Sequence, residues 1–148
     1  MEFTTLGRTG FRVSVVGMGC GGASRLGQSY GNSEEQSIAV VRRALELGIN
    51  YIDTAEGYRT EEIVGKAIAG MPRDQIYLST KKNPWKDGAP VSGDERIAGC
   101  EASLRRLGTD YVEVYHIHGP HDYQAQHVKE ELVPALLKLK EQGKIRAT

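Results

Sequence analysis

The sequence has 148 residues, a length typical of one domain with a sizeable buried core. Hydrophobic residues make up 39% and charged residues 26%, which argues against a disordered chain, and an apolar run such as residues 135–137 is far too short to cross a bilayer. Because 19 basic residues offset 19 acidic ones, the composition indicates neither a nucleic-acid nor an acidic-membrane partner.

The cysteine content and the N-terminal residues bear on the compartment. Cys20 and Cys100 are the only cysteines, and their separation fits neither a metal-binding motif nor a disulfide framework. The chain does not open on a basic region followed by an apolar stretch, so we expect no signal peptide. A cytoplasmic protein is therefore expected.

The first predicted unit is a strand followed by a helix. Residues 13–18 are β-branched and apolar, which predicts a strand, and the glycine cluster 19–22 ends it. Ser33 and Gln36 have the spacing of a capping box, in which each side chain satisfies a free backbone N–H at a helix start. The predicted helix carries Ile38, Val41 and Leu45 on one face, and Gly48 marks its end.

This unit then repeats along the chain. Further strands are predicted at residues 49–53, 75–80 and 110–118. Helices are predicted at 61–69, from an N-cap at Asp94 to Leu107, and at 128–142, where Pro134 is tolerated if it opens the main segment. Residues 143–146 stop the last helix and begin a fifth strand.

Strands that recur about every 30 residues, each followed by a helix, predict a parallel sheet with right-handed crossovers. An open doubly wound sheet and a (β/α)8 TIM-type barrel both have this pattern. In the open fold a glycine-rich turn leads directly into a helix, but here no helix opens after Gly17, Gly19 and Gly22 until Ser33. That difference favours the barrel.

Three predicted strands end in ionisable side chains, namely Asp53, Lys81 and His118. The C-terminal ends of parallel barrel strands converge on the face where barrel enzymes have their sites. Strand alternation places Lys81 on the lumen side with Tyr77 and Ser79, whereas Lys82 points the other way. Tyr58 follows Asp53 by five residues, on the loop above the same face.

Together these residues form an acid–base set. A free tyrosine is a weak acid for protonating a carbonyl oxygen near neutral pH. A neighbouring lysine ammonium would stabilise its phenolate, an aspartate would hold that lysine, and a histidine could orient the substrate carbonyl by a hydrogen bond. The set is Asp53, Tyr58, Lys81 and His118.

Several strings of the sequence resemble the aldo-keto reductase family. YIDTAEGY at residues 51–58, followed by EEIVGKA at 61–67, is similar to the family segment carrying the catalytic Asp and Tyr. LSTK at 78–81 resembles the strand with the catalytic Lys, and SLRRLGTDYV at 103–112, running into IHGP at 117–120, resembles the stretch with the catalytic His. LGRTG at 6–10 and GKIRA at 143–147 resemble the opening hairpin and the fifth strand.

The resemblance implies an oxidoreductase that transfers a hydride between NADPH (or NADP⁺) and an aldehyde, ketone or alcohol. Tyr58 would be the general acid, Lys81 and Asp53 would tune it, and His118 would orient the carbonyl. Gly19, Cys20 and Gly21 would line the nicotinamide end of the cofactor site, with Asp53 close to the ribose. Small-molecule carbonyls and alcohols are the expected substrates, with no nucleic-acid or membrane partner; the particular substrate is left open.

The resemblance covers only the N-terminal half of the family's barrel. Residues 1–148 correspond to a short β-hairpin, four βα units and the start of a fifth strand, and most family contacts to the cofactor's phosphates and adenine lie beyond that point. We therefore expect the chain to need a complementary C-terminal half and to be inactive alone. His116 also departs from the family, because that position is usually aliphatic.

Three alternatives remain at this stage. The chain could be a non-catalytic regulatory or binding module on the same scaffold, although a complete acid–base set argues against this. His116, His118 and His121 could hold a divalent metal, but no carboxylate cluster accompanies them, so no metal is predicted. Trp85, in the loop of residues 83–93, could be a hydrophobic anchor or part of a substrate-pocket wall.

Overall fold

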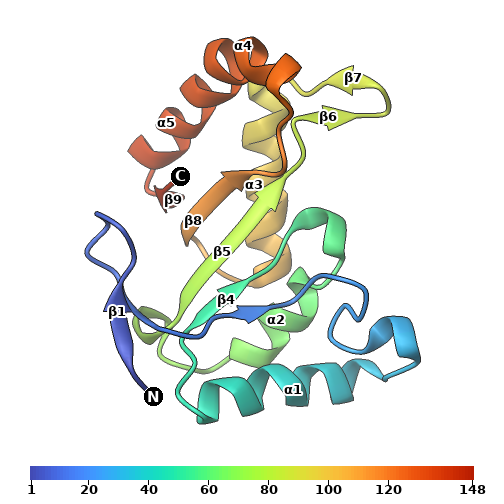
Figure 1. The fold of residues 1–148 in the computed structure, drawn as a ribbon, viewed down its shortest axis with the longest axis vertical. Coiled ribbons are helices and arrows are strands. Elements are labelled where there is room, and N and C mark those ends of the chain that lie inside the picture. Colours follow the sequence, from blue (N-terminus) through green and yellow to red (C-terminus); the bar gives the residue numbers. More distant parts are fainter.

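The computed structural model describes residues 1–148 as a curved, five-stranded parallel sheet with helices on one face (Figure 1). The strand order is β3-β4-β5-β8-β9, and every neighbouring pair is parallel, as the alternating pattern predicts. The strands are β3 Met18–Gly19, β4 Tyr51–Asp53, β5 Tyr77–Lys82, β8 Val112–Ile117 and β9 Ile145–Ala147. No helix is both long and apolar enough to cross a membrane.

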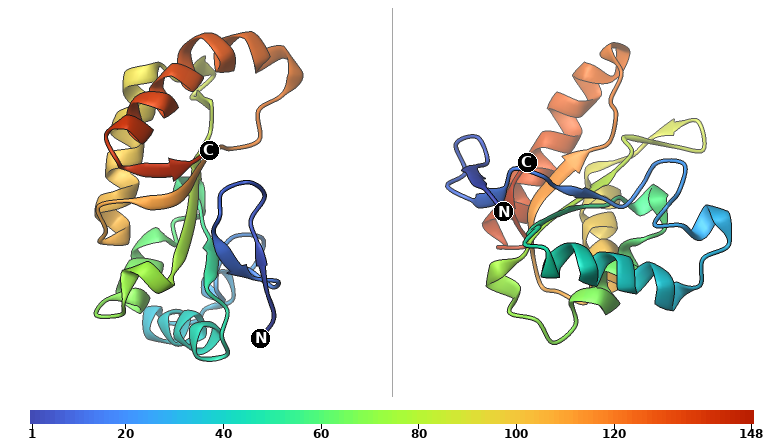
Figure 2. Two further views of the ribbon diagram at one scale, coloured as in Figure 1. Left: turned by 90° about the vertical axis from the view of Figure 1, so that its left-hand side faces the viewer. Right: turned by 60° about the horizontal axis from the view of Figure 1, so that its bottom comes forward.

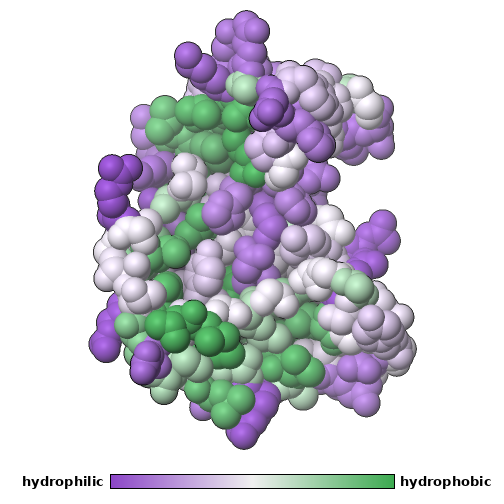
Figure 3. Space-filling model, viewed as in Figure 1, coloured by the Kyte–Doolittle hydropathy of each residue, from purple (hydrophilic) through white to green (hydrophobic).

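The helices return the chain from one strand to the next, all on the same side of the sheet (Figure 2). The main ones are α1 Glu34–Glu46, α2 Glu61–Ile68, α3 Gly93–Leu107 and α5 Val133–Glu141. A cluster of 18 buried hydrophobic residues lies between helices and sheet, and it includes Val41, Ile52, Val64, Leu78 and Leu104. The opposite face of the sheet is concave, and Figure 3 shows hydrophilic residues near its middle, between hydrophobic areas above and below.

Shorter elements lie at the two ends of the sheet. The hairpin of β1 Phe3–Thr5 and β2 Arg12–Ser14 is at the N-terminal end of the strands, and the hairpin of β6 Trp85–Lys86 and β7 Ala89–Pro90 follows β5. A one-turn helix, α4 Ala125–His127, continues through a π-helical turn at Val128–Leu132 into α5. Pro134 lies in the first turn of α5, directly after this π-helical turn.

One predicted strand in the N-terminal half of the chain differs from the structure. The strand predicted at residues 13–18 is divided, because β2 pairs antiparallel with β1 whereas β3 pairs parallel with β4. Between them the chain bends, and Val15 and Val16 are 54% and 53% exposed. Asn50 fixes this bend by accepting a hydrogen bond from the Ser14 N–H at 2.7 Å.

The predicted element boundaries also shift at other places. The N-cap of α3 is Ser92 rather than Asp94, because the Ser92 side chain accepts from the Glu95 N–H and Glu95 in turn binds the Ser92 N–H. The strand predicted from residue 75 starts at Tyr77, after a 3-10 turn, and His118 lies one residue beyond the end of β8. The predicted capping box at Ser33 and Gln36 is confirmed.

Candidate active site

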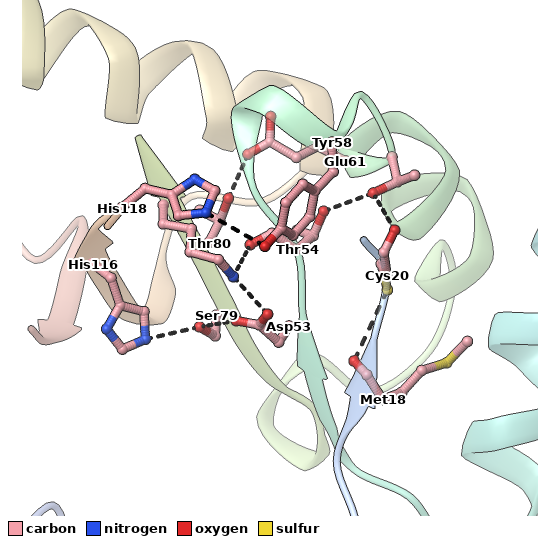
Figure 4. Close-up of polar contacts among 12 residues, drawn as sticks. Met18, Cys20, Asp53, Thr54, Tyr58, Glu61, Ser79, Thr80, His116 and His118 are labelled. Carbon is pink, nitrogen blue, oxygen red and sulfur yellow. Dashed lines mark hydrogen bonds and ion pairs between the residues drawn. The ribbon is translucent and has the colours of Figure 1, made fainter. Parts of the chain in front are cut away.

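Strands β4, β5 and β8 bring the four predicted site residues to one end of the sheet (Figure 4). Asp53 ends β4, Lys81 lies near the end of β5, and His118 follows β8, where its N–H donates to the Lys82 carbonyl at 2.9 Å. Tyr58 ends the 3-10 turn η2 Glu56–Tyr58, directly after β4. The parallel register aligns these strand ends, so residues far apart in the sequence become neighbours.

Lys81 is held by two acceptors. Its Nζ lies 2.5 Å from Asp53 Oδ2 and 2.8 Å from the Thr54 carbonyl. The Lys81 side chain is 12% exposed and that of Asp53 34% exposed, so the pair borders the concave face without being fully buried. The Lys81 ammonium is thereby fixed in position and charge-paired on one side.

Tyr58 lies between Lys81 and His118. Its hydroxyl is 3.5 Å from His118 Nε2, and the two rings meet edge to face with centroids 5.4 Å apart. The Lys81 Nζ is 5.0 Å from the centroid of the Tyr58 ring, within the range of a cation–π contact. A phenol, an ammonium and an imidazole thus share one small space, as an acid–base site requires.

Backbone contacts fix the position of Tyr58, and the sequence analysis missed them. A Cβ added to Gly21 would lie 2.5–2.6 Å from three atoms of the Tyr58 ring, so the ring packs directly on the Gly21 backbone. The Arg25 side chain donates from Nε to the Tyr58 carbonyl at 3.0 Å. The only sequence signal for this close approach is the glycine cluster itself.

The two histidines near Lys81 are neutral around pH 7. Burial lowers the pKa of His118 below its usual 6.5, the Lys81 charge lowers it further, and Asp53 opposes both. The pKa of His116 is lowered for the same main reason, its burial. A neutral His118 can donate one hydrogen bond and accept another.

The glycine cluster has two different environments. A Cβ added to Gly19 would meet no atom within 4 Å, so this exposed backbone faces open space beside Asp53, its partner in the β3–β4 register. Cys20 is fully buried among the hydrophobic core residues, and burial raises the pKa of its thiol to about 12. The Cys20 backbone is also occupied, because its N–H donates to the Asp53 carbonyl at 2.8 Å and its carbonyl accepts from the Thr60 hydroxyl at 3.1 Å.

The strand alternation predicted for β5 is confirmed. Ser79 and Lys81 contact Asp53 on the lumen side, whereas Thr80 donates to Glu61 of α2 at 2.6 Å on the helix side. Lys82 also points to the helix side, where its Nζ lies 2.6 Å from Glu56. The helix-side contacts tie the end of β5 to α2 and to the turn that carries Tyr58.

The remaining histidines and Trp85 have separate partners. No group of three or more His, Cys, Asp or Glu side chains is placed to hold a metal ion, and His121 stacks on Tyr123 with centroids 5.4 Å apart. Trp85 packs edge to face on His127 and Tyr123, with centroid distances of 5.4 and 6.3 Å. Trp85 is thus an anchor for the β6–β7 hairpin over the segment that leads into α4.

Comparisons with known proteins agree with this geometry. A model of the "Aldo/keto reductase family" matches residues 17–148. L-galactose dehydrogenase of Arabidopsis thaliana is 37% identical over 152 residues, which cover 99% of this chain and 47% of that protein. Aldo-keto reductase YhdN of Bacillus subtilis (strain 168) is 38% identical over 156 residues, covering 99% and 46% respectively.

Solved structures give the same result. The holo form of aldo-keto reductase AKR11C1 from Bacillus halodurans superposes with a TM-score of 0.81 at 35% identity, covering 99% of this chain and 48% of that one. A thermostable aldo-keto reductase solved with the inhibitor epalrestat superposes with a TM-score of 0.83 at 32% identity, covering 99% and 52%. The chain spans about half the length of these relatives, and its fold is that of half a (β/α)8 barrel.

Proposed function

The chain belongs to the aldo/keto reductase family, and we propose that its site transfers a hydride between NADPH and an aldehyde or ketone, or in reverse from an alcohol to NADP⁺. The observation that carries this proposal is the convergence of Asp53, Tyr58, Lys81 and His118 at one end of the sheet. The names of related proteins support the reaction class, since they include a dehydrogenase of L-galactose and a reductase of methylglyoxal.

The proton is proposed to come from Tyr58. Its hydroxyl would donate to the carbonyl oxygen as negative charge develops there, and the nearby Lys81 ammonium would stabilise the phenolate that remains. Asp53 keeps that ammonium in position through the 2.5 Å contact. His118, whose pKa is lowered mainly by partial burial, would donate a hydrogen bond that orients the substrate oxygen.

The proposed cofactor fits the strand β3 side of the site. Open space lies over Gly19, where any side chain would intrude, and this space borders Asp53, whose carboxylate is one-third exposed. We propose that Gly19, Cys20, Gly21 and Asp53 form the wall against which the nicotinamide and its ribose bind, with Cys20 buried between the two glycines. NADPH, when bound, supplies the hydride; the residues of this chain supply the proton and the orientation.

The complete protein is proposed to contain a second half-barrel. The sheet has two free edges, at β3 and β9, and a barrel needs both to be paired. The complementary strands would also provide contacts to the cofactor's phosphates and adenine. Both cysteines are buried and free, which supports the proposal of a reducing, cytoplasmic compartment.

Substituting the proposed acid tests this function. In the two-half protein, Tyr58→Phe should lower kcat by about 10²- to 10⁴-fold, measured as NADPH consumption with a panel of aldehydes and ketones. NADPH affinity should be nearly unchanged, because the phenol acts in the transition state. Tyr30→Phe, at a tyrosine that is 74% exposed, is the matched control and should behave as wild type.

Two results would contradict the proposal. Equal activity in Tyr58→Phe and wild type would remove Tyr58 from the role of general acid. A wild-type protein that binds NADPH tightly but turns over no carbonyl or alcohol would instead indicate the non-catalytic module.

A further inference from the structure

His116 belongs to the lumen side of the sheet but has no part in the acid–base set described above. It pairs with Lys81 in the β5–β8 register, two residues before His118 along the chain. Its Nε2 lies 3.1 Å from Ser79 Oγ, and Ser79 Oγ lies 2.8 Å from Asp53 Oδ1 (Figure 4). A hydrogen-bonded line therefore runs from His116 through Ser79 to the carboxylate that holds Lys81.

The direction of these hydrogen bonds follows from their chemistry. The carboxylate of Asp53 can only accept, so the single hydroxyl proton of Ser79 is donated to Asp53 Oδ1. Ser79 Oγ is then left with lone pairs toward His116, and the His116 Nε2 must carry a proton to donate. Because burial keeps His116 neutral, its Nδ1 carries none.

Asp53 needs this support because of its position. One carboxylate oxygen binds Lys81 and the other binds Ser79, while the side chain is one-third exposed. The terminal torsion of an aspartate is broad, so a carboxylate held at one oxygen only would rotate toward water. Fixing both oxygens keeps the Lys81 ammonium beside the Tyr58 ring, 5.0 Å from its centroid.

We propose that His116 is a positioning residue: through Ser79 it fixes the Asp53 carboxylate, and thereby the Lys81 ammonium that supports Tyr58. The charged and titratable groups around it are Asp53, Lys81 and His118, and none of them donates to Ser79 in its place. An aliphatic side chain at this position would leave Ser79 Oγ without its donor. Only the expected effect of His116 on turnover rests on the proposed function.

The first test needs no activity. Long-range ¹H–¹⁵N spectra of the two-half protein, with residues 1–148 labelled, should show His116 as the neutral Nε2–H tautomer near neutral pH, and the Lys81 ammonium as a slowly exchanging signal. In His116→Leu and Ser79→Ala the Lys81 signal should exchange faster, whereas His116→Gln, which keeps an N–H at a similar position, should retain it. The Nδ1–H tautomer, or a Lys81 signal indifferent to His116→Leu, would overturn the proposal.

The second test separates this inference from the proposed function. In the two-half enzyme, His116→Leu and Ser79→Ala should each lower kcat about tenfold with KM and NADPH affinity unchanged. The double variant should be no worse than either single one, since both interrupt one line of contacts. His116→Gln should restore most of kcat, and equal loss in Gln and Leu would count against the proposal.

If Tyr58→Phe abolishes turnover but His116→Leu does not change it, only the role of His116 fails. If neither substitution affects turnover, the proposed function fails as well. Should His116→Leu not fold, the tautomer of the unsubstituted chain and the activity of His116→Gln still decide the question.

Discussion

At the scale of single residues, the site depends on where a tyrosine ring and a lysine ammonium are held. Tyr58 packs on a glycine backbone and has its own carbonyl bound by Arg25, while Lys81 has two oxygen acceptors. Effective catalysis requires reacting groups to be placed within a fraction of an ångström, so these contacts should control rate more than cofactor affinity.

Gly21→Ala tests the contact below the Tyr58 ring. The new Cβ would lie 2.5–2.6 Å from ring atoms, so the ring must move by about 1 Å, a displacement that can cost about 10²-fold in kcat. Gly57→Ala is the matched control, because a Cβ at this neighbour of Tyr58 meets no atom within 4 Å. Steady-state kinetics that rank the two variants equally would mean that the ring is not held by Gly21.

Lys81 and Lys82 are adjacent but point to opposite faces of the sheet, so Lys81→Met and Lys82→Met should have different effects. Lys81→Met should be about as damaging to kcat as Tyr58→Phe, because the ammonium beside the phenol is lost. Lys82→Met breaks the ion pair with Glu56 on the helix side, so it should lower the melting temperature while leaving most of kcat. A reversed pattern in kinetics and thermal unfolding would mean that the β5 alternation is misassigned.

The partly buried imidazoles of His116 and His118 make stability depend on pH. The folded-state pKa values of His116 and His118 lie below the 6.5 of an exposed imidazole, so the unfolded chain takes up protons first as the pH falls. The free energy of unfolding that these two histidines contribute is complete above about pH 6.5. It is lost as the pH falls through their folded-state pKa values. The melting temperature should therefore fall between about pH 7 and about pH 5, and less steeply in His116→Gln/His118→Gln. An equally steep fall in this double variant would contradict the assignment.

At the scale of elements, the start of α3 is attached to the end of β5. Arg96, in the second turn of α3, is fully buried and donates to the carbonyls of Lys82 and Asn83 at the end of β5. The backbone of Lys82, the residue after Lys81, is thus held from the helix side of the sheet. A weakened start of α3 should consequently loosen the end of β5 as well.

Ser92→Ala tests the observed cap of α3. Loss of a capping hydroxyl typically costs about 1 kcal/mol of unfolding free energy. Asp94→Ala is the control: it lies within the first turn, where its charge contributes about 0.3–1 kcal/mol through the helix dipole, but it caps nothing. Chemical denaturation should therefore rank Ser92→Ala as the more destabilised, and the opposite order would restore Asp94 as the cap.

At the scale of the whole molecule, the sheet is curved but open. The edge strands β3 and β9 each have one paired side, and Val15 and Val16, beside β3, are more than half exposed. Unpaired strand edges and exposed apolar side chains favour association. We expect the contacts to the cofactor's phosphate groups to come from the proposed complementary half-barrel.

Residues 1–148 alone should accordingly form dimers or larger assemblies and bind NADPH weakly. Size-exclusion chromatography with light scattering and a fluorescence titration of NADPH would measure both properties. Addition of a complementary half-barrel should reduce self-association and increase NADPH affinity. A monodisperse monomer that binds NADPH at low micromolar levels would show that this half is self-sufficient.

The sequence by itself determined the order of strands and helices and the four candidate site residues. Parallel βα alternation is encoded in local periodicity, and the ends of α1 and α3 are marked by Gly48 and Gly108, both with positive φ. Strand alternation also placed Lys81 and Lys82 on opposite faces. These features depend on neighbours in the chain, which is why a single sequence predicts them.

Only the tertiary structure decided what the site residues touch. The division of residues 13–18 depends on Asn50, 36 residues away from Ser14, and the packing of Tyr58 on Gly21 joins two separate loops. The line from His116 through Ser79 to Asp53 exists only because three strands lie in one register. Such contacts depend on how the strands pair across the whole sheet. Local sequence patterns do not show which distant segments lie next to each other in space.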